Sequence, residues 1–248
     1  LFSLLFLFIF SIPSVSAVQY LSSCKTSGWT SGETYYLTTN VSSTGTCMNI
    51  DVNNVTLDCQ GHAITYATSS NGYGIYINAA NFTNIRNCRI QANSGFTICH
   101  GIVIQFGQPS FNLIENNTII ISNPDSYGIM LNSGVAVTYN NTIRNNTIQV
   151  SGSFAALSLL WRTENSFIYN NRIINTNSNG QGIGFISGGN NLLYNNFINA
   201  STPVNQSSTW LNYWNVTRNC SSGPNIVGGQ YIGGNFYATA SGNGFSET

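Results

Sequence analysis

The residues of this 248-residue chain that could carry acid–base chemistry are few. Charged residues make up 6% of the sequence, against about 25% in ordinary soluble domains. Glycoside cleavage needs two carboxylates on one face within about 10 Å of each other, and lyases add acidic calcium ligands and a basic proton acceptor. The acidic residues are Glu33, Asp51, Asp58, Glu115, Asp125, Glu164 and Glu247. Their scarcity argues against a polysaccharide-cleaving site, so we predict no catalytic residue.

Soft-metal donors are equally scarce. Copper sites need clusters of His, Met or thiolate, whereas the chain has two His, His62 and His100, and two Met, Met48 and Met130, far apart in sequence. Neither a nucleophile elbow nor a phosphate-binding loop is present. Seven basic residues balance seven acidic ones, which excludes a basic nucleic-acid surface. The sequence therefore predicts no metal site, no cofactor and no nucleic-acid partner.

Two short patterns repeat with a period of about 25 to 29 residues, which indicates a solenoid. The first is an apolar residue, a variable one, two Asn-rich positions, a variable one and Ile, at 85–90, 114–119, 143–148, 168–173 and 193–198. The second is a strand at 73–77, 100–104, 127–131, 155–159 and 181–185, usually with Gly as its second residue. Short strands with Gly or Asn at the bends and no helical segment predict an all-β fold, a parallel β-helix.

Stacked coils place equivalent residues of the repeat about 4.8 Å apart in columns. The Ile columns are expected to point inward and form the core. We expect the first Asn of each pair to form an asparagine ladder joined by side-chain amides. Its members are Asn87, Asn116, Asn145, Asn170 and Asn195.

One outward column carries charges of alternating sign. Asp58, Arg86, Glu115 and Arg144 occupy the same position of four successive copies, and Tyr169 continues the column. Opposite charges on adjacent strands stabilise a sheet by about 0.2 to 1 kcal/mol per pair. We therefore interpret these four residues as a structural ladder rather than as catalytic groups.

These motifs resemble a known family. The segment 54–62 (NVTLDCQGH), the Tyr-Gly-Ile strands, the Asn-Asn turns and the tail segments 212–215 and 228–237 are similar to NosD-type repeats of bacterial and archaeal surface proteins. The resemblance implies a right-handed, single-stranded parallel β-helix of the pectin-lyase-like superfamily, with about seven to nine coils. It also implies an association with copper, and it specifies architecture better than chemistry.

The predicted organisation is a single elongated domain behind a leader. Residues 1–17 look like a signal peptide that lacks its start, 18–50 a capping segment with the first coil, 51–211 the repeats, and 212–248 a closing segment that stops short. A cleaved leader predicts a secreted, extracellular or cell-surface protein, periplasmic in a Gram-negative bacterium, without a membrane span. Oxidising conditions favour a disulfide between Cys24 and Cys47. Cys88 is open to pairing with Cys59 or Cys99.

The binding candidates are aromatic. Tyr73, His100 and Tyr127 precede the Gly of three successive coils, where stacked rings could support a sugar or simply pack across strands. Trp210, Tyr213 and Trp214 are expected to cover the open end of the solenoid. The expected function is a non-catalytic exported or cell-surface module for adhesion, glycan binding or structural spacing, with surface glycans or polysaccharide as partners. The alternatives are a pectin-lyase-like carbohydrate hydrolase or lyase, and a periplasmic copper-delivery protein.

Overall fold

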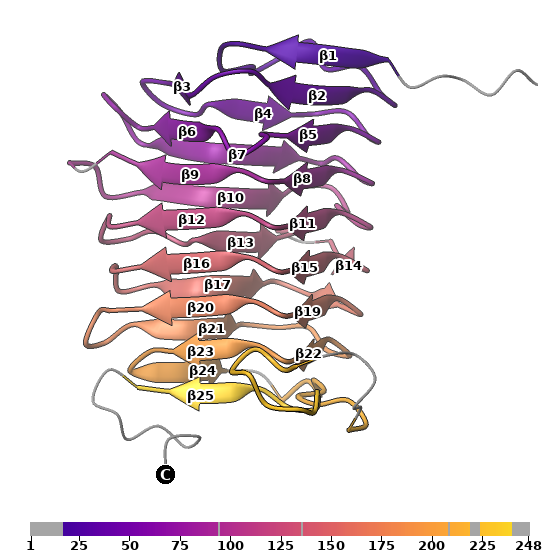
Figure 1. Ribbon diagram of the computed structural model, residues 1–248, viewed down its shortest axis with the longest axis vertical. Helices are drawn as coiled ribbons and strands as arrows, with labels where there is room; N and C mark the ends of the chain where they lie inside the picture. The colour runs from indigo at the N-terminus through magenta and orange to yellow at the C-terminus, as the bar shows by residue number, and fades with distance from the viewer. Residues whose placement is uncertain (1–16, 94, 135, 208, 219–223, 240–248) are drawn as a thin grey trace, which may run out of the picture.

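The computed structural model describes residues 17–93, 95–134, 136–207, 209–218 and 224–239. The hydrophobic part of the predicted signal peptide, Cys220 and Glu247 lie outside these residues. No described segment is helical, and the strands form three long parallel sheets wound around one axis (Figure 1). The predicted all-β parallel β-helix is confirmed.

The three sheets, here called A, B and C, each receive one strand from nearly every turn of the chain. In spatial order, sheet A contains β1 (Val18–Leu21), β2 (Thr34–Leu37), β5 (Thr56–Asp58), β8 (Asn84–Arg86), β11 (Leu113–Glu115), β15 (Thr142–Arg144), β19 (Phe167–Tyr169) and β22 (Leu192–Tyr194). Sheet B contains β4 (Met48–Ile50), β7 (Gly72–Asn78), β10 (Cys99–Gln105), β13 (Ile129–Asn132), β17 (Ala155–Leu160), β21 (Gln181–Phe185) and β24 (Thr202–Gln206). Sheet C contains β3 (Val41–Ser42), β6 (Ala63–Tyr66), β9 (Arg89–Ala92), β12 (Thr118–Ile121), β16 (Thr147–Val150), β20 (Arg172–Asn175), β23 (Phe197–Asn199) and β25 (Phe236–Ala238). A short pair, β14 (Thr138–Tyr139) and β18 (Thr163–Glu164), forms a fourth sheet.

The core is built from the aliphatic columns that the repeat predicts. In sheet A, Ile85, Ile114 and Ile143 are fully buried and lie in register on adjacent strands. In sheet C, Ile119 and Ile148 are also buried and in register. Burying one such side chain stabilises the fold by about 1.5 to 3 kcal/mol, so the columns account for the straight stacking of the coils.

The asparagine ladder lies one residue later than the sequence predicts. The second Asn of each pair is buried, and its side-chain Nδ2 donates to Oδ1 of the equivalent Asn in the next coil at 2.9–3.1 Å. This ladder contains Asn117, Asn146, Asn171, Asn196 and Asn235. The strand periodicity does not reveal which of two adjacent Asn side chains points into the bend.

The predicted ladder residues instead shape the bend. Asn87, Asn116, Asn145, Asn170 and Asn195 all have φ between 51° and 57°, the left-handed region that Asn tolerates better than most residues. Among the described residues, a bond between two of these side chains is recorded for Asn195 and Asn170, at 2.7 Å. The prediction of a continuous amide ladder on these five residues is therefore wrong.

The two ends of the helix are closed differently. Disulfides join Cys24 to Cys47 and Cys59 to Cys88, with Cα–Cα distances of 4.8 and 4.7 Å, while Cys99 is free and buried. The predicted Cys24–Cys47 bond is thus confirmed, and Cys59 is the partner of Cys88.

At the C-terminal end, one of the three predicted capping residues packs on the core. Trp214 contacts Phe185 edge-on, with ring centroids 5.7 Å apart. Trp210 and Tyr213 are about half exposed. Tyr213 pairs with Leu192 at the edge of sheet A, and Trp210 and Tyr213 are not among the residues packed on the core, so their covering of the open end stays a prediction.

Candidate functional site

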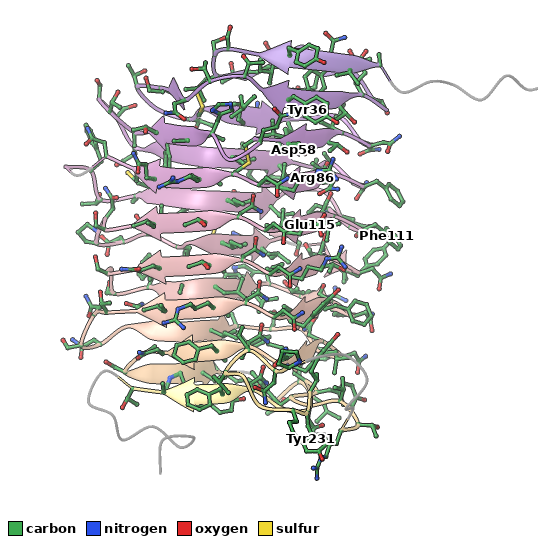
Figure 2. All side chains as sticks on the ribbon, viewed as in Figure 1. Tyr36, Asp58, Arg86, Phe111, Glu115 and Tyr231 are labelled. Carbon is green, nitrogen blue, oxygen red and sulfur yellow. A yellow bond between two sulfur atoms is a disulfide. The ribbon has the colours of Figure 1, made fainter. Side chains whose placement is uncertain are left out.

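The charged column on sheet A is stacked as predicted. Asp58, Arg86, Glu115 and Arg144 are aligned on four adjacent strands, and Figure 2 labels the first three. Arg86 Nε lies 2.9 Å from Asp58 Oδ2, and Arg144 contacts Glu115 Oε2 at 2.6 Å. The alternating signs therefore resolve into two ion pairs, each between neighbouring coils.

Asp58 and Glu115 are the two carboxylates of the charged column. They lie two strands apart in one column, about 10 Å at the usual strand spacing, but Arg86 lies between them. Asp58 also accepts bonds from the Gln60 backbone and the Asn87 side chain at 2.9 Å. The side chains of Asp58 and Glu115 are only 10% and 11% exposed, so their carboxylates bind arginines and turn groups rather than face a substrate.

The rings of Tyr73, His100 and Tyr127 do lie together on sheet B. The ring centroids of Tyr73 and His100 are 5.6 Å apart and nearly parallel, and those of His100 and Tyr127 are 5.1 Å apart and tilted. His100 is 7% exposed, and its Nδ1 accepts the Tyr127 backbone N–H at 3.2 Å. Burial lowers the pKa of His100 to about 4 and leaves little of its imidazole accessible to a ligand.

A recess lies on the outer face of sheet A, where tyrosines continue the charged column. Tyr169 and Tyr194 stack with centroids 5.0 Å apart and planes 7° apart. Residues of the closing segment, from Tyr213 to Thr217, and Ile232 line the other side of a groove of about 1150 Å³. Its lining residues are Phe167, Tyr169, Asn170, Asn190, Leu192, Tyr194, Tyr213, Asn215, Val216, Thr217 and Ile232.

Backbone pairing fixes the two walls of this groove. The Leu193 N–H donates to Tyr213 O at 2.7 Å, and the Tyr213 N–H donates to Asn191 O at 2.8 Å. These bonds hold the start of the closing segment beside β22, and the Val216 N–H extends the wall by donating to Gly233 O at 3.2 Å. The groove therefore has one rigid sheet wall and one wall of hydrogen-bonded loop.

The groove is electrically neutral. None of the described residues that line it is charged, and its polar groups are tyrosine and threonine hydroxyls and asparagine amides. Arg144 lies in the preceding coil, and its Nη1 donates to the Tyr169 hydroxyl at 3.0 Å. Burial raises the pKa of Tyr194, so its hydroxyl stays protonated at neutral pH and can donate or accept a hydrogen bond.

Sequence reasoning missed the groove, although one signal was available. Tyr169 and Tyr194 extend the charged column, and aromatic residues gather in the tail. What the repeat pattern does not show is that the tail folds back beside β22.

Comparison with known proteins places the fold in a family. A family model described as "Periplasmic copper-binding protein (NosD)" matches residues 18–242. The chain belongs to the NosD family. No curated protein and no solved structure matches it. Within the described residues, no helix is long and apolar enough to cross a membrane.

The family description raises the question of copper, and the described donors do not fit such a site. Met48 and Cys99 are fully buried in the core, Met130 is 5% exposed, and His100 is stacked between tyrosines. The described residues contain no group of three or more His, Cys, Asp or Glu side chains that could hold a metal. Soft-metal binding needs such donors to converge, and here they are distributed among separate coils.

Proposed function

We propose that this NosD-family chain is a non-catalytic, exported module that binds a neutral glycan in the groove over β19 and β22. The observation that carries the proposal is the stacked pair Tyr169–Tyr194 in a recess lined by hydroxyls and amides without charge. Apolar sugar faces pack on aromatic rings, and sugar hydroxyls both donate to and accept from amides and hydroxyls. The groove's volume of about 1150 Å³ exceeds the roughly 300–1,000 Å³ of ordinary small-molecule sites, so it suits an oligosaccharide.

The engagement of the charged column's two carboxylates supports a binding role over an enzymatic one. Asp58 and Glu115 are held in ion pairs outside the groove, whereas hydrolysis needs an acid and a second carboxylate beside the scissile bond. The straight stack of coils also suits adhesion or spacing, because a rigid rod can hold a ligand site at a fixed distance from its other end. The family description favours copper delivery as the alternative, which would require donors other than those that the described residues gather.

Binding to a panel of neutral and acidic oligosaccharides tests the proposal. We expect neutral oligosaccharides to bind, and Tyr194→Ala and Tyr213→Ala each to weaken binding about tenfold through lost ring contacts. Tyr20→Ala, at an exposed tyrosine at the other end of the molecule, is the matched control and should leave affinity unchanged. Chelators should have no effect, because calcium needs clustered acidic oxygens.

Three outcomes would contradict the proposal. The first is the absence of glycan binding, and the second is binding that Tyr194→Ala leaves intact. The third is the release of reducing ends or unsaturated products from the bound glycan, which would indicate an enzyme. Stoichiometric copper uptake in a parallel titration, without glycan binding, would favour the copper-delivery alternative.

A further inference from the structure

The outer face of sheet B contains an abrupt step in side-chain size. Tyr76, Val103 and Met130 lie in register on β7, β10 and β13, and the next two positions of this column are Ser158 on β17 and Gly184 on β21. The change from large to small side chains occurs between β13 and β17. It leaves a second cavity, of about 290 Å³, which we call the sheet B hollow.

The neighbouring column shows the same step. It begins with the stacked rings of Tyr73, His100 and Tyr127. Because Leu157 pairs with Ile129, Ala155 is the residue of the next coil that corresponds to Tyr127. Ala155 in turn pairs with Gln181. Phe154, the residue before Ala155, adds one more ring to the stack beside Tyr127, and the sheet B hollow lies next to these two rings.

The lining of the sheet B hollow is partly apolar and partly polar. Tyr127 and Phe154 stack with centroids 4.9 Å apart, and Phe154 remains 37% exposed. The cavity is also lined by the polar residues Gln181, Asn205 and Ser207 and by the apolar residues Leu160, Phe185 and Ile186. None of the described residues that line it is charged. A ligand here meets aromatic and aliphatic side chains together with neutral hydrogen-bonding groups.

Gly184 keeps the floor of the sheet B hollow open. A Cβ at Gly101 or Gly128 would come within 2.7 Å of a carbonyl oxygen in the next coil, so coil stacking requires glycine there. A Cβ at Gly184 would meet only side-chain atoms, the nearest being Ala155 Cβ and Gln181 Oε1 at 3.2 Å. Its φ is not in the left-handed region. A Cβ at Gly184 would therefore be tightly packed, but against side chains rather than the backbone of the next coil, and an interior strand glycine can mark the close approach of a ligand.

We propose that the sheet B hollow binds one neutral pyranose ring. The apolar face of the sugar packs against Phe154, and its hydroxyls reach Gln181, Asn205 and Ser207. A pyranose fits better than a purely aromatic ligand because its polar rim matches the polar part of the lining, and better than a charged ligand because the lining carries no counter-charge. This site is independent of the groove proposed above, since that groove lies on sheet A and shares none of these residues.

Titration of the folded protein with single-ring sugars tests the inference. The probes are the neutral methyl pyranosides of glucose, galactose and N-acetylglucosamine, with backbone amide chemical shifts as the readout. A ligand of this size in a shallow site should bind with a dissociation constant of about 1 mM. We expect shifts at the Gly184 and Gln181 amides, and the same shifts in Tyr194→Ala. Because Tyr194→Ala disables the groove alone, the two proposals fail separately.

Variants of the sheet B hollow sharpen the test. Gly184→Leu fills the cavity and should reduce affinity at least tenfold. Gln181→Ala removes a polar partner without filling space and should weaken binding severalfold. Thr202→Ala is the matched control, because Thr202 follows Gln181 in the same column but does not line the cavity. Thermal melts establish that each variant is folded, and Gln181→Ala decides the question if Gly184→Leu unfolds.

Three results would overturn the inference. One is an unshifted Gly184 amide at saturating concentrations of all three pyranosides. Another is equal affinity in wild type and in Gln181→Ala, or in a folded Gly184→Leu. The third is a shift at Gly184 with benzyl alcohol but with none of the pyranosides, which would identify the site as one for aromatic ligands.

Discussion

His100 illustrates how position in a stack determines the chemistry of a single residue. As a lone histidine beside a glycine, it could be a ligand, a base or a sugar contact. The structure encloses it between Tyr73 and Tyr127 and uses its Nδ1 as an acceptor for the Tyr127 N–H. The neighbouring outward position is Val103, which is fully buried. His100 is therefore a neutral packing residue, and the periodicity predicted its ring neighbours but not its burial.

The buried imidazole should make stability depend on pH in a defined window. The pKa of His100 is about 4 in the folded chain and 6.5 in the reference state, so the unfolded chain binds the extra proton first. The free energy of unfolding should therefore fall as pH drops below 6.5 and level off near 4, by about 3 kcal/mol at most. His100→Tyr, which copies the residue of the adjacent coils, should remove this contribution. Denaturant melts of both proteins between pH 4 and 7 measure the difference, and parallel curves would contradict it.

At the scale of the element, the bends are held by polar ladders as well as by the aliphatic core. In the four bends between sheets A and C that have an Asn pair, the first Asn takes a left-handed conformation and the second turns inward. A second polar ladder runs through the bends between sheets B and A. It includes Asn112, Asn141, Ser166, Asn191 and Asn212. Both ladders satisfy backbone groups that a turn leaves without strand partners.

The sequence predicted these elements unevenly, for physical reasons. The Ile columns were predictable because burial alternates with period two along a strand. The positions of the Asn-Asn bends were predictable. Which Asn side chain of each pair points inward was not, because the bend interrupts that alternation. The groove and the sheet B hollow were not predicted. Each site depends on residues that break the repeat. The groove needs Tyr213 of the tail, and the sheet B hollow needs Gly184, where earlier coils have bulkier outward residues.

Substitutions at one Asn pair should separate the two roles. Asn146 is 1% exposed, accepts the Asn117 backbone N–H at 3.0 Å and donates to Ile114 O at 2.9 Å. Asn146→Ala leaves these groups buried without partners and should cost about 3 kcal/mol. Asn145→Gly retains the left-handed conformation and should cost well under 1 kcal/mol. Urea melts compare the two, and equal losses would mean that the amide ladder does not stabilise the bend.

For the whole molecule, the order of stability along the axis follows from where the crosslinks lie. Each coil of a solenoid contacts mainly its neighbours, so stability is close to a sum of coil and interface contributions. Both disulfides of the described residues lie in the N-terminal coils, between Cys24 and Cys88. The later coils rely on aliphatic columns, amide ladders and the packing of Trp214 on Phe185. Within the described residues, the N-terminal end is therefore reinforced covalently, and the C-terminal coils are held by packing and hydrogen bonds.

Reduction should accordingly loosen one end of the helix and spare the other. The two disulfides close segments of 23 and 29 residues, each worth about 3 kcal/mol in the chain-entropy model. Hydrogen exchange should show faster opening of β2 and β5 after reduction, with β16 and β20 unchanged, because the loss is local to the crosslinked coils. Paired Cys59→Ala and Cys88→Ala substitutions should reproduce the change without a reductant. Buried Cys99 should resist alkylation throughout. A uniform loss of protection in all three sheets would mean instead that the coils unfold as one cooperative unit.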